Sequence, residues 1–96
     1  MKTLRFSSQF KKDVKRYRNQ PKKMEKVAEI LRMLRDEIPI PRKFKPHLLK
    51  GEYKNCMECH VESDFLLIWI DEKQNQIGIL RLGSHAELFK NRNFLF

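Results

Sequence analysis

The sequence predicts an α+β protein with the element order β-α-α-β-β-β, an antiparallel sheet and a helical hairpin on one face of that sheet. Two observations lead to this fold class. Apolar residues recur with the helical period over residues 10–38, and three short runs rich in β-formers follow over residues 53–82, separated by polar turns. The 96 residues suffice for a single domain, 1–96, with one hydrophobic core.

Residues 2–6 are predicted to form a short first strand. Ser7 or Ser8 then caps a helix, since a serine oxygen can accept a hydrogen bond from an N–H group that has no partner in the first helical turn. The apolar positions of this helix recur at the amphipathic spacing, with lysine and arginine between them; they are Phe10, Val14 and Tyr17.

Asn19-Gln20-Pro21 ends this helix and begins a second one, in which proline is suited to the first position. Pro39 and Pro41 end the second helix. Because only a few residues join the two helices, we expect them to form an antiparallel hairpin. The apolar stripe of the second helix comprises Met24, Val27, Ala28, Leu31, Leu34 and Ile38.

Three strands are predicted after an ordered loop over residues 40–52. The first, residues 53–61, alternates in polarity, which places Tyr53, Met57, Cys59 and Val61 on one side and Lys54, Cys56, Glu58 and His60 on the other. Residues 65–70 are an apolar run typical of a central strand, and residues 76–82 form the last strand. Ser84 caps a short C-terminal helical turn through Phe89. Because the helices cover one face of the sheet, the other face is left for function.

Positive charge is the strongest feature of the composition, since 21 Lys and Arg against 12 Asp and Glu give a formal net charge of +9. Such a field attracts polyanions and accelerates their association, which favours a nucleic-acid partner or an acidic protein partner. The longest apolar run, residues 65–70, is far shorter than the ~18 residues of a membrane helix, and no export signal precedes the charged residues 11–13. We therefore expect a cytoplasmic protein without a membrane partner.

The residues that can carry chemistry lie mostly in the second half of the chain. The histidines are His47 in the loop, His60 at the end of a strand and His85 just after another strand. Asp64 follows His60 by four residues. Arg81 and His85 have the same parity, so they project from the same side if the strand continues, and Glu58 shares the polar side of its strand with His60. If these sides form a single open face, three imidazoles, two carboxylates and a guanidinium converge there.

This set of side chains suits the cleavage of RNA, which carries its own nucleophile in the ribose 2′-hydroxyl. The reaction needs a base for that proton, an acid for the 5′-oxygen and a cation for the charge on phosphorus. Histidine can be acid or base, because its ordinary pKa near 6.5 allows both protonation states near neutrality. A carboxylate such as Asp64 favours an imidazolium and orients its ring, and Arg81 is suited to bidentate phosphate contact. No metal and no other cofactor is required.

Cys56-Met57-Glu58-Cys59-His60 matches the pattern of covalent haem attachment. We reject this interpretation, because residues i and i+3 of a strand point to opposite faces and their thiols cannot bind one haem or one zinc ion. A disulfide is not expected in a reducing cytoplasm. Cys59 is predicted to lie in the core and Cys56 to be exposed or half-exposed.

Three blocks of sequence resemble the YafQ subgroup of the RelE/ParE toxin superfamily. They are His47-Leu-Leu-Lys-Gly51, Glu58-Cys-His60-Val-Glu-Ser-Asp64 and Leu80-Arg-Leu-Gly-Ser-His85-Ala-Glu-Leu-Phe89. The resemblance extends over nearly the whole chain, including the first strand and the helical hairpin. It implies a RelE-like fold and the toxin of a bacterial type II toxin–antitoxin system, a ribosome-dependent mRNA endonuclease that enters the A site and cuts within codons.

The resemblance also implies site residues and partners. The catalytic set comprises His47, His60, Asp64 and His85. Arg81 steadies the scissile phosphate and Phe89 stacks on a base, although a packing role for Phe89 at the terminal turn is an equal alternative. Glu58 is a supporting residue and replaces the aspartate found in many members. The implied partners are mRNA in the ribosomal A site, ribosomal RNA and a cognate antitoxin, with DNA contacted only through the antitoxin complex.

Two other functions remain open from the sequence. A gyrase-inhibiting toxin on the same fold is disfavoured, because that branch generally lacks the histidine cluster. A non-catalytic basic RNA-binding or ribosome-binding domain explains the charge of +9 but leaves the histidines without a role. The residues alone do not assign acid and base, and Asp64 as the proton acceptor is an alternative. Residues 90–96 extend past the usual end of the family, with Phe94-Leu95-Phe96 either packed on the core or in contact with the antitoxin.

Overall fold

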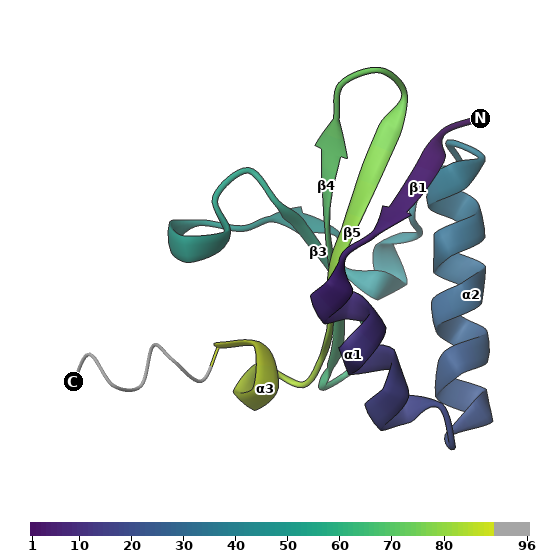
Figure 1. Ribbon diagram of the computed structural model, residues 1–96, viewed down its shortest axis with the longest axis vertical. Helices are drawn as coiled ribbons and strands as arrows, with labels where there is room; N and C mark the ends of the chain where they lie inside the picture. Colours follow the sequence, from purple (N-terminus) through teal and green to yellow (C-terminus); the bar gives the residue numbers. More distant parts are fainter. Residues whose placement is uncertain (90–96) are drawn as a thin grey trace.

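The computed structural model of the chain describes residues 1–89, and the prediction for Phe94-Leu95-Phe96 lies outside this range. Figure 1 shows two helices on one side of a twisted sheet and a third, short helix on the other side. No helix within residues 1–89 has the length and apolar character needed to cross a membrane. The elements are β1 (Thr3–Phe6), α1 (Ser8–Tyr17), α2 (Pro21–Arg35), η1 (Arg42–Phe44), β2 (His47–Leu48), η2 (Gly51–Tyr53), β3 (Met57–Glu62), β4 (Phe65–Glu72), β5 (Gln76–Gly83) and α3 (His85–Phe89).

The five strands form one sheet in the order β1-β5-β4-β3-β2. The pairs β3–β4 and β4–β5 are antiparallel, as predicted, and the pair β2–β3 is antiparallel as well. The predicted antiparallel sheet gains one parallel pair, because β1 pairs parallel to β5. The direction of β5 is set by its hairpin with β4, and β1, which precedes both helices in the chain, pairs with the other edge of β5. Local sequence periodicity carries no information about that choice of edge.

The helical hairpin forms as predicted, and Ser7 is its first cap, since the Ser7 Oγ accepts a hydrogen bond from the Phe10 N–H at 2.9 Å. Pro21 occupies the start of α2. The predicted stripe was wrong at its end, because Glu37 has a φ of 60°, a left-handed conformation that an α-helix does not allow. Ile38 therefore lies beyond the helix and is 52% exposed, whereas Ile30, which the predicted stripe omitted, is fully buried.

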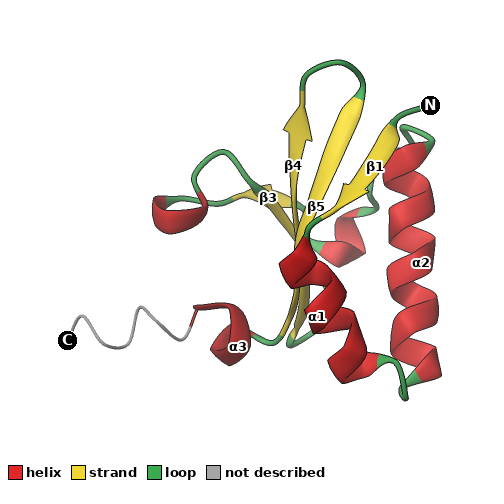
Figure 2. Cartoon of the chain, in the orientation of Figure 1, coloured by secondary structure: helices red, strands yellow, loops and turns green. Residues whose placement is uncertain are grey.

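The main core lies between the helices and one face of the sheet (Figure 2). Its fully buried members come from both layers; Val27 and Ile30 of α2 meet Cys59 of β3, Leu67 of β4, and Ile79 and Leu82 of β5. The opposite face was predicted to be left open, and here the structure differs. A second apolar cluster covers part of that face, built on Cys56, Leu66, Ile68 and Leu88, with Tyr53 and Phe89 packed against it.

The segment before β3 differs most from the prediction. The strand begins at Met57 and not at Tyr53, which belongs to η2 and packs on the second face, away from Cys59. Cys56 is only 6% exposed, so the prediction of an exposed or half-exposed thiol was wrong. In addition, the predicted loop contains the short strand β2, and this strand brings His47 into the sheet.

Candidate active site

Three imidazoles from separate segments meet on the second face of the sheet. The ring centroids of His47 and His60 are 6.2 Å apart, and those of His60 and His85 are 5.8 Å apart. The strand register explains the first contact, since His47 of β2 is paired with Glu58 of β3, two residues before His60. The contact between His60 and His85 follows from two further pairings. His60 of β3 is paired with Leu66 of β4, and Leu66 is paired with Gly83 of β5, two residues before His85. The structure thus brings together the three predicted histidines.

Glu58 forms the floor of this cluster. Its side chain is only 4% exposed, and its Oε1 lies 3.2 Å from Nε2 of His47 and 3.8 Å from Nε2 of His60. The other ring nitrogen of His47, Nδ1, lies 2.8 Å from the carbonyl oxygen of Lys45. A carbonyl oxygen only accepts hydrogen bonds, so Nδ1 of His47 carries a hydrogen. One further proton can then be shared between Nε2 of His47 and the Glu58 carboxylate.

Asp64 makes a different contact with His85. A single carboxylate oxygen, Oδ1, accepts a hydrogen bond from the backbone N–H of His85 at 2.9 Å and lies 2.7 Å from its Nδ1. The backbone hydrogen bond and then the side-chain hydrogen bond from His85 lower the pKa of Asp64 below its ordinary value. An ionised Asp64 requires a hydrogen on Nδ1 of His85, which leaves Nε2 available for proton transfer.

An open hollow of about 720 Å³ adjoins this cluster, lined by Leu49, Lys50, Gly51, Glu58, His85, Ala86 and Phe89. The Phe89 ring lies at 6.2 Å from the ring of His85 and packs edge-on against Tyr53 at 5.5 Å. Phe89 therefore has an exposed part next to an imidazole and a packed part against the second apolar cluster. Both of the roles considered for it have a structural basis.

A second hollow, of about 530 Å³, reaches His60 from the other side. Three lysines from two elements line it, Lys26 of α2 and Lys43 and Lys45 around η1. Glu29 and Glu62 also line it, and Lys26 donates to Glu62 at 3.0 Å. His85 thus lines one hollow and His60 the other, and the ammonium groups of the second are suited to phosphate where the two carboxylates leave them accessible.

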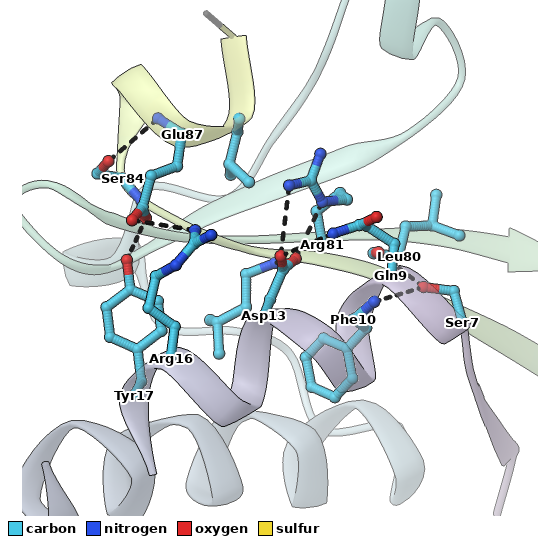
Figure 3. Close-up of polar contacts among 12 residues, drawn as sticks. Ser7, Gln9, Phe10, Asp13, Arg16, Tyr17, Leu80, Arg81, Ser84 and Glu87 are labelled. Atoms are coloured by element: carbon cyan, nitrogen blue, oxygen red, sulfur yellow. Dashed lines mark hydrogen bonds and ion pairs between the residues drawn. The ribbon is translucent and has the colours of Figure 1, made fainter. Parts of the chain in front are cut away.

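Arg81 occupies a different position from the one expected. It lies in the same cross-strand row as Glu58, but Ile68 of β4 separates them. Its guanidinium extends toward α1, where Nε donates to Asp13 Oδ2 at 2.9 Å and Nη2 to Asp13 Oδ1 at 3.3 Å (Figure 3). The remaining Nη1 donates to the Tyr53 hydroxyl at 3.3 Å. The hydrogen bond to Asp13 raises the pKa of Arg81.

Arg81 lines a third hollow, of about 790 Å³, together with Tyr53, Arg16 and Glu87. Ala86 borders both this hollow and the one beside His85, so the two adjoin at α3. Tyr53 connects them as well, because its hydroxyl contacts Arg81 while its ring packs on Phe89. Asp13 occupies the edge of the guanidinium formed by Nε and Nη2. A phosphate can therefore bind only the N–H groups of Nη1 and Nη2 that Tyr53 and Asp13 do not use.

The sequence analysis missed two residues that contact Arg81, namely Asp13 and Tyr53. Asp13 is 1% exposed on a helix that is otherwise rich in exposed lysine. Its position three residues after Phe10 and four before Tyr17 places it in the apolar stripe, and this spacing was an available signal for a buried carboxylate. Tyr53 carried no such signal, because its contact depends on the course of the loop.

The two cysteines lie on opposite faces of the sheet, as their spacing predicts. Cys59 belongs to the main core and Cys56 to the second cluster, and both are free thiols. Burial raises the pKa of Cys59 to about 12 and also raises that of Cys56. Within the part of the chain that the structure describes, no group of three or more His, Cys, Asp or Glu side chains is arranged to hold a metal ion.

Comparison with known proteins places these features in a family. Residues 2–90 match the sequence model of a family described as the bacterial toxin of a type II toxin–antitoxin system, YafQ. A curated relative, the mRNA interferase toxin YafQ of Escherichia coli, is 34% identical over 88 residues, which covers 90% of this chain and 94% of the relative.

Solved structures give the same result. A crystal structure of a metal-bound toxin from Helicobacter pylori superposes with a TM-score of 0.84 at 38% identity, covering 93% of this chain and 100% of that one. The toxin in the E. coli DinJ–YafQ complex superposes with a TM-score of 0.81 at 32% identity, covering 93% of this chain and 99% of that one.

Proposed function

This chain belongs to the YafQ family of bacterial type II toxin–antitoxin toxins, and on that basis we propose that it is an mRNA interferase that cuts RNA by general acid–base catalysis. One observation carries the proposal, the meeting of three imidazoles with two carboxylates beside an open hollow. The proposed catalytic residues are His47, His60, Asp64 and His85, with Arg81, Phe89 and Glu58 in supporting roles.

His85 is proposed as the general base. Asp64 keeps the hydrogen of His85 on Nδ1, so a neutral ring has its lone pair on Nε2 and can accept the proton of the 2′-hydroxyl. The oxyanion then attacks the adjacent phosphorus in line with the 5′-oxygen. Asp64 also stabilises the imidazolium that forms, in the manner of the carboxylate in a serine-protease triad.

His47 is proposed as the general acid. Both of its ring nitrogens face acceptors, the Lys45 carbonyl and the Glu58 carboxylate, so each N–H group of a ring that carries two hydrogens has a partner. Such a ring donates the Nε2 proton, which lies beside Glu58, to the departing 5′-oxygen and becomes neutral. The chain thus supplies both proton-transfer groups, and the RNA supplies the nucleophile.

His60 and Arg81 are proposed to stabilise charge on the phosphate. His60 lies between the other two imidazoles and reaches the lysine-lined hollow. The free N–H groups of Arg81 act from the adjoining hollow, where Asp13 holds the guanidinium in place. Preorganised donors of this kind need no rearrangement as charge develops. Phe89 is proposed as a platform on which one base stacks.

The proposed partners follow from charge and from the family. Exposed lysines of α1 and α2 are suited to bind ribosomal RNA, which would place the histidine cluster at mRNA in the ribosomal A site, in the cytoplasm. Because a YafQ toxin forms a complex with DinJ in E. coli, we propose a cognate antitoxin for this chain also, with DNA contacted only through that complex.

The test is transcript cleavage mapped by primer extension after expression of the chain, and then with purified chain and mRNA, with and without ribosomes. We expect cuts within codons that require ribosomes, and we expect His60→Ala and His85→Ala to abolish both cleavage and growth arrest while thermal unfolding stays cooperative. Arrest by both variants would refute the proposal. DNA damage signalling without cleavage would indicate gyrase inhibition, and RNA binding without cleavage a non-catalytic domain.

A further inference from the structure

The short helix α3 has five residues, His85–Phe89, and its first and last residues are both in the proposed site. A helix of this length is not stable by itself, because nucleation fixes several dihedral angles for few hydrogen bonds. Its position must therefore come from contacts outside it. Asp64 supplies one of them at the His85 end. Leu88 supplies another, since it is buried in the second apolar cluster and its carbonyl oxygen accepts a hydrogen bond from the Tyr53 hydroxyl at 3.3 Å. A further set of contacts converges on Glu87, in the middle of the helix.

Glu87 first completes a capping box with Ser84. The Glu87 N–H donates to Ser84 Oγ at 3.2 Å, and the Ser84 N–H donates to Glu87 Oε1 at 2.8 Å. This reciprocal pair satisfies two N–H groups at the start of the helix. The pattern Ser84-x-x-Glu87 is visible in the sequence. For this purpose one carboxylate oxygen is enough.

Glu87 also contacts α1, and capping does not require these contacts. The Tyr17 hydroxyl donates to Glu87 Oε1, and Nη1 of Arg16 lies 3.1 Å from Glu87 Oε2 (Figure 3). Tyr17 is itself fixed in the main core, where its ring lies 4.6 Å from that of Phe65. Figure 3 shows Glu87 reaching from α3 across to these two side chains of α1.

The charge of Glu87 and the space around it fit this role. Burial acts to raise the pKa of Glu87, but the hydrogen bonds from Tyr17 and Ser84 and the charge of Arg16 outweigh it, so the pKa is lowered. The carboxylate is thus ionised at neutral pH. The approach is also close, since a Cβ at position 83 would lie 2.7 Å from Glu87 Oε1, so a larger residue in place of Gly83 would displace this carboxylate.

We infer that Glu87 is a positioning residue for RNA cleavage, which orients His85 and Phe89 by joining α3 to Tyr17 and Arg16 of α1. This inference rests on the proposed function. Asp64 fixes the beginning of α3 at one edge, and Glu87 fixes its orientation about that point. Without Glu87 the His85 ring loses its alignment with the phosphate, although no reacting atom touches Glu87.

The test uses Glu87→Gln, Glu87→Ala and Tyr17→Phe. Glutamine keeps an oxygen for the Ser84 N–H but loses the ion pair with Arg16, and Tyr17→Phe keeps the core ring but removes the hydroxyl. Glu72→Gln and Glu72→Ala are matched controls, because Glu72 is 29% exposed like Glu87 and pairs with Arg5 at 2.9 Å. The readouts are kcat and KM for RNA cleavage, thermal unfolding, and the NMR resonances of the three histidine rings.

For Glu87→Ala we expect kcat to fall roughly 10- to 100-fold with a smaller change in KM, as misplacement of a reacting group does. Glu87→Gln and Tyr17→Phe should give smaller losses that are not additive in the double variant. The His85 resonance and its titration should shift in all of them, while those of His47, on the far side of His60, stay constant. The Glu72 variants should change none of these quantities.

A kcat for Glu87→Gln and Tyr17→Phe equal to that of the Glu72 controls, or a His85 resonance that does not move in the Glu87 variants, overturns the inference. A lower unfolding temperature of the Glu87 variants at unchanged kcat would also overturn it, because Glu87 would then only cap the helix. If Glu87→Ala does not fold, Glu87→Gln and Tyr17→Phe decide. The NMR arm needs no RNA, so it still tests Glu87 if the wild-type chain fails to cut and the proposed function is refuted.

Discussion

Asp13 on α1 and Arg81 on β5 are separated by 68 residues in the sequence and form two hydrogen bonds, of 2.9 Å and 3.3 Å. The same carboxylate accepts the backbone N–H of Leu82 at 2.9 Å. Strand β1 ends its pairing with β5 at Ile79, so beyond that point a helix side chain replaces the missing strand. Asp13 therefore has two roles, since its carboxylate accepts the Leu82 N–H at the edge of the sheet and also holds the Arg81 guanidinium.

Replacement of Asp13 by alanine should destabilise the fold by about 3 kcal/mol, because it leaves the buried Leu82 N–H without a partner and Arg81 without its counter-ion. Urea unfolding of Asp13→Ala checks this value. Lys12→Ala is the control, since Lys12 is exposed on the same helix and should change the free energy of unfolding by no more than about 0.5 kcal/mol. Equal stability of the two variants would contradict the assigned role.

Replacement of Asp64 by asparagine should lower the cleavage rate by about 100-fold or more, because a neutral amide no longer fixes the hydrogen of His85 on Nδ1. Single-turnover cleavage rates against pH measure the effect. Asp71→Asn is the matched control, as its side chain is 60% exposed against 64% for Asp64 and it pairs with Lys2 away from the site. A rate equal to that of the control would exclude Asp64 from the mechanism.

Replacement of Phe89 by leucine separates its two roles. Leucine keeps apolar packing against Tyr53 but removes the aromatic face, so RNA binding should weaken by about 1–3 kcal/mol. Fluorescence anisotropy with labelled RNA reports affinity, and thermal unfolding reports packing. Phe6→Leu is the control, because Phe6 is 42% exposed and stacks on Phe10 outside the site. Lost stability at unchanged affinity would make Phe89 a packing residue only.

The ionisation of Tyr17 should report the contact between α1 and α3. Burial, followed by the hydrogen bond to Glu87, raises the pKa of Tyr17 from 10.0 to about 12. Since folding favours the neutral phenol, its contribution to stability is complete below pH 10.0 and is lost as the pH rises toward about 12. The chain has two tyrosines, so tyrosinate absorbance in Tyr53→Phe measures Tyr17 alone. A midpoint near 10.0 would show that the contact is absent in solution.

Much of the fold was predictable because it depends on local periodicity. The spacing of Phe10, Val14 and Tyr17 and the positions of Ser7 and Pro21 were sufficient for the helical hairpin. The same reasoning failed at Ile38, where one left-handed residue ends the stripe. It failed again at Tyr53, where alternating polarity continued past the true start of the strand.

The candidate site was predictable in its membership but not in its geometry. His60 and His85 meet as expected because strand parity and the short turn at Asp64 constrain them. His47 joins them through the pairing of β2 with β3, which the sequence did not predict. The position of Arg81 was not predictable, since its direction depends on Asp13 from a distant helix. The spacing of Lys45 and His47 also did not predict that the Lys45 carbonyl oxygen holds a hydrogen on Nδ1 of His47.

By itself the sequence determined the chemical groups, the net charge of +9 and the local elements, because helical and extended backbones impose their periods on neighbouring residues. Tertiary structure decided which edge of the sheet receives β1, that β2 brings His47 to Glu58, and that Glu87 reaches Tyr17 across 70 positions of the chain. The reason is physical. Strand pairing and buried ion pairs are long-range interactions whose partners are chosen by packing, and a local pattern does not encode that choice.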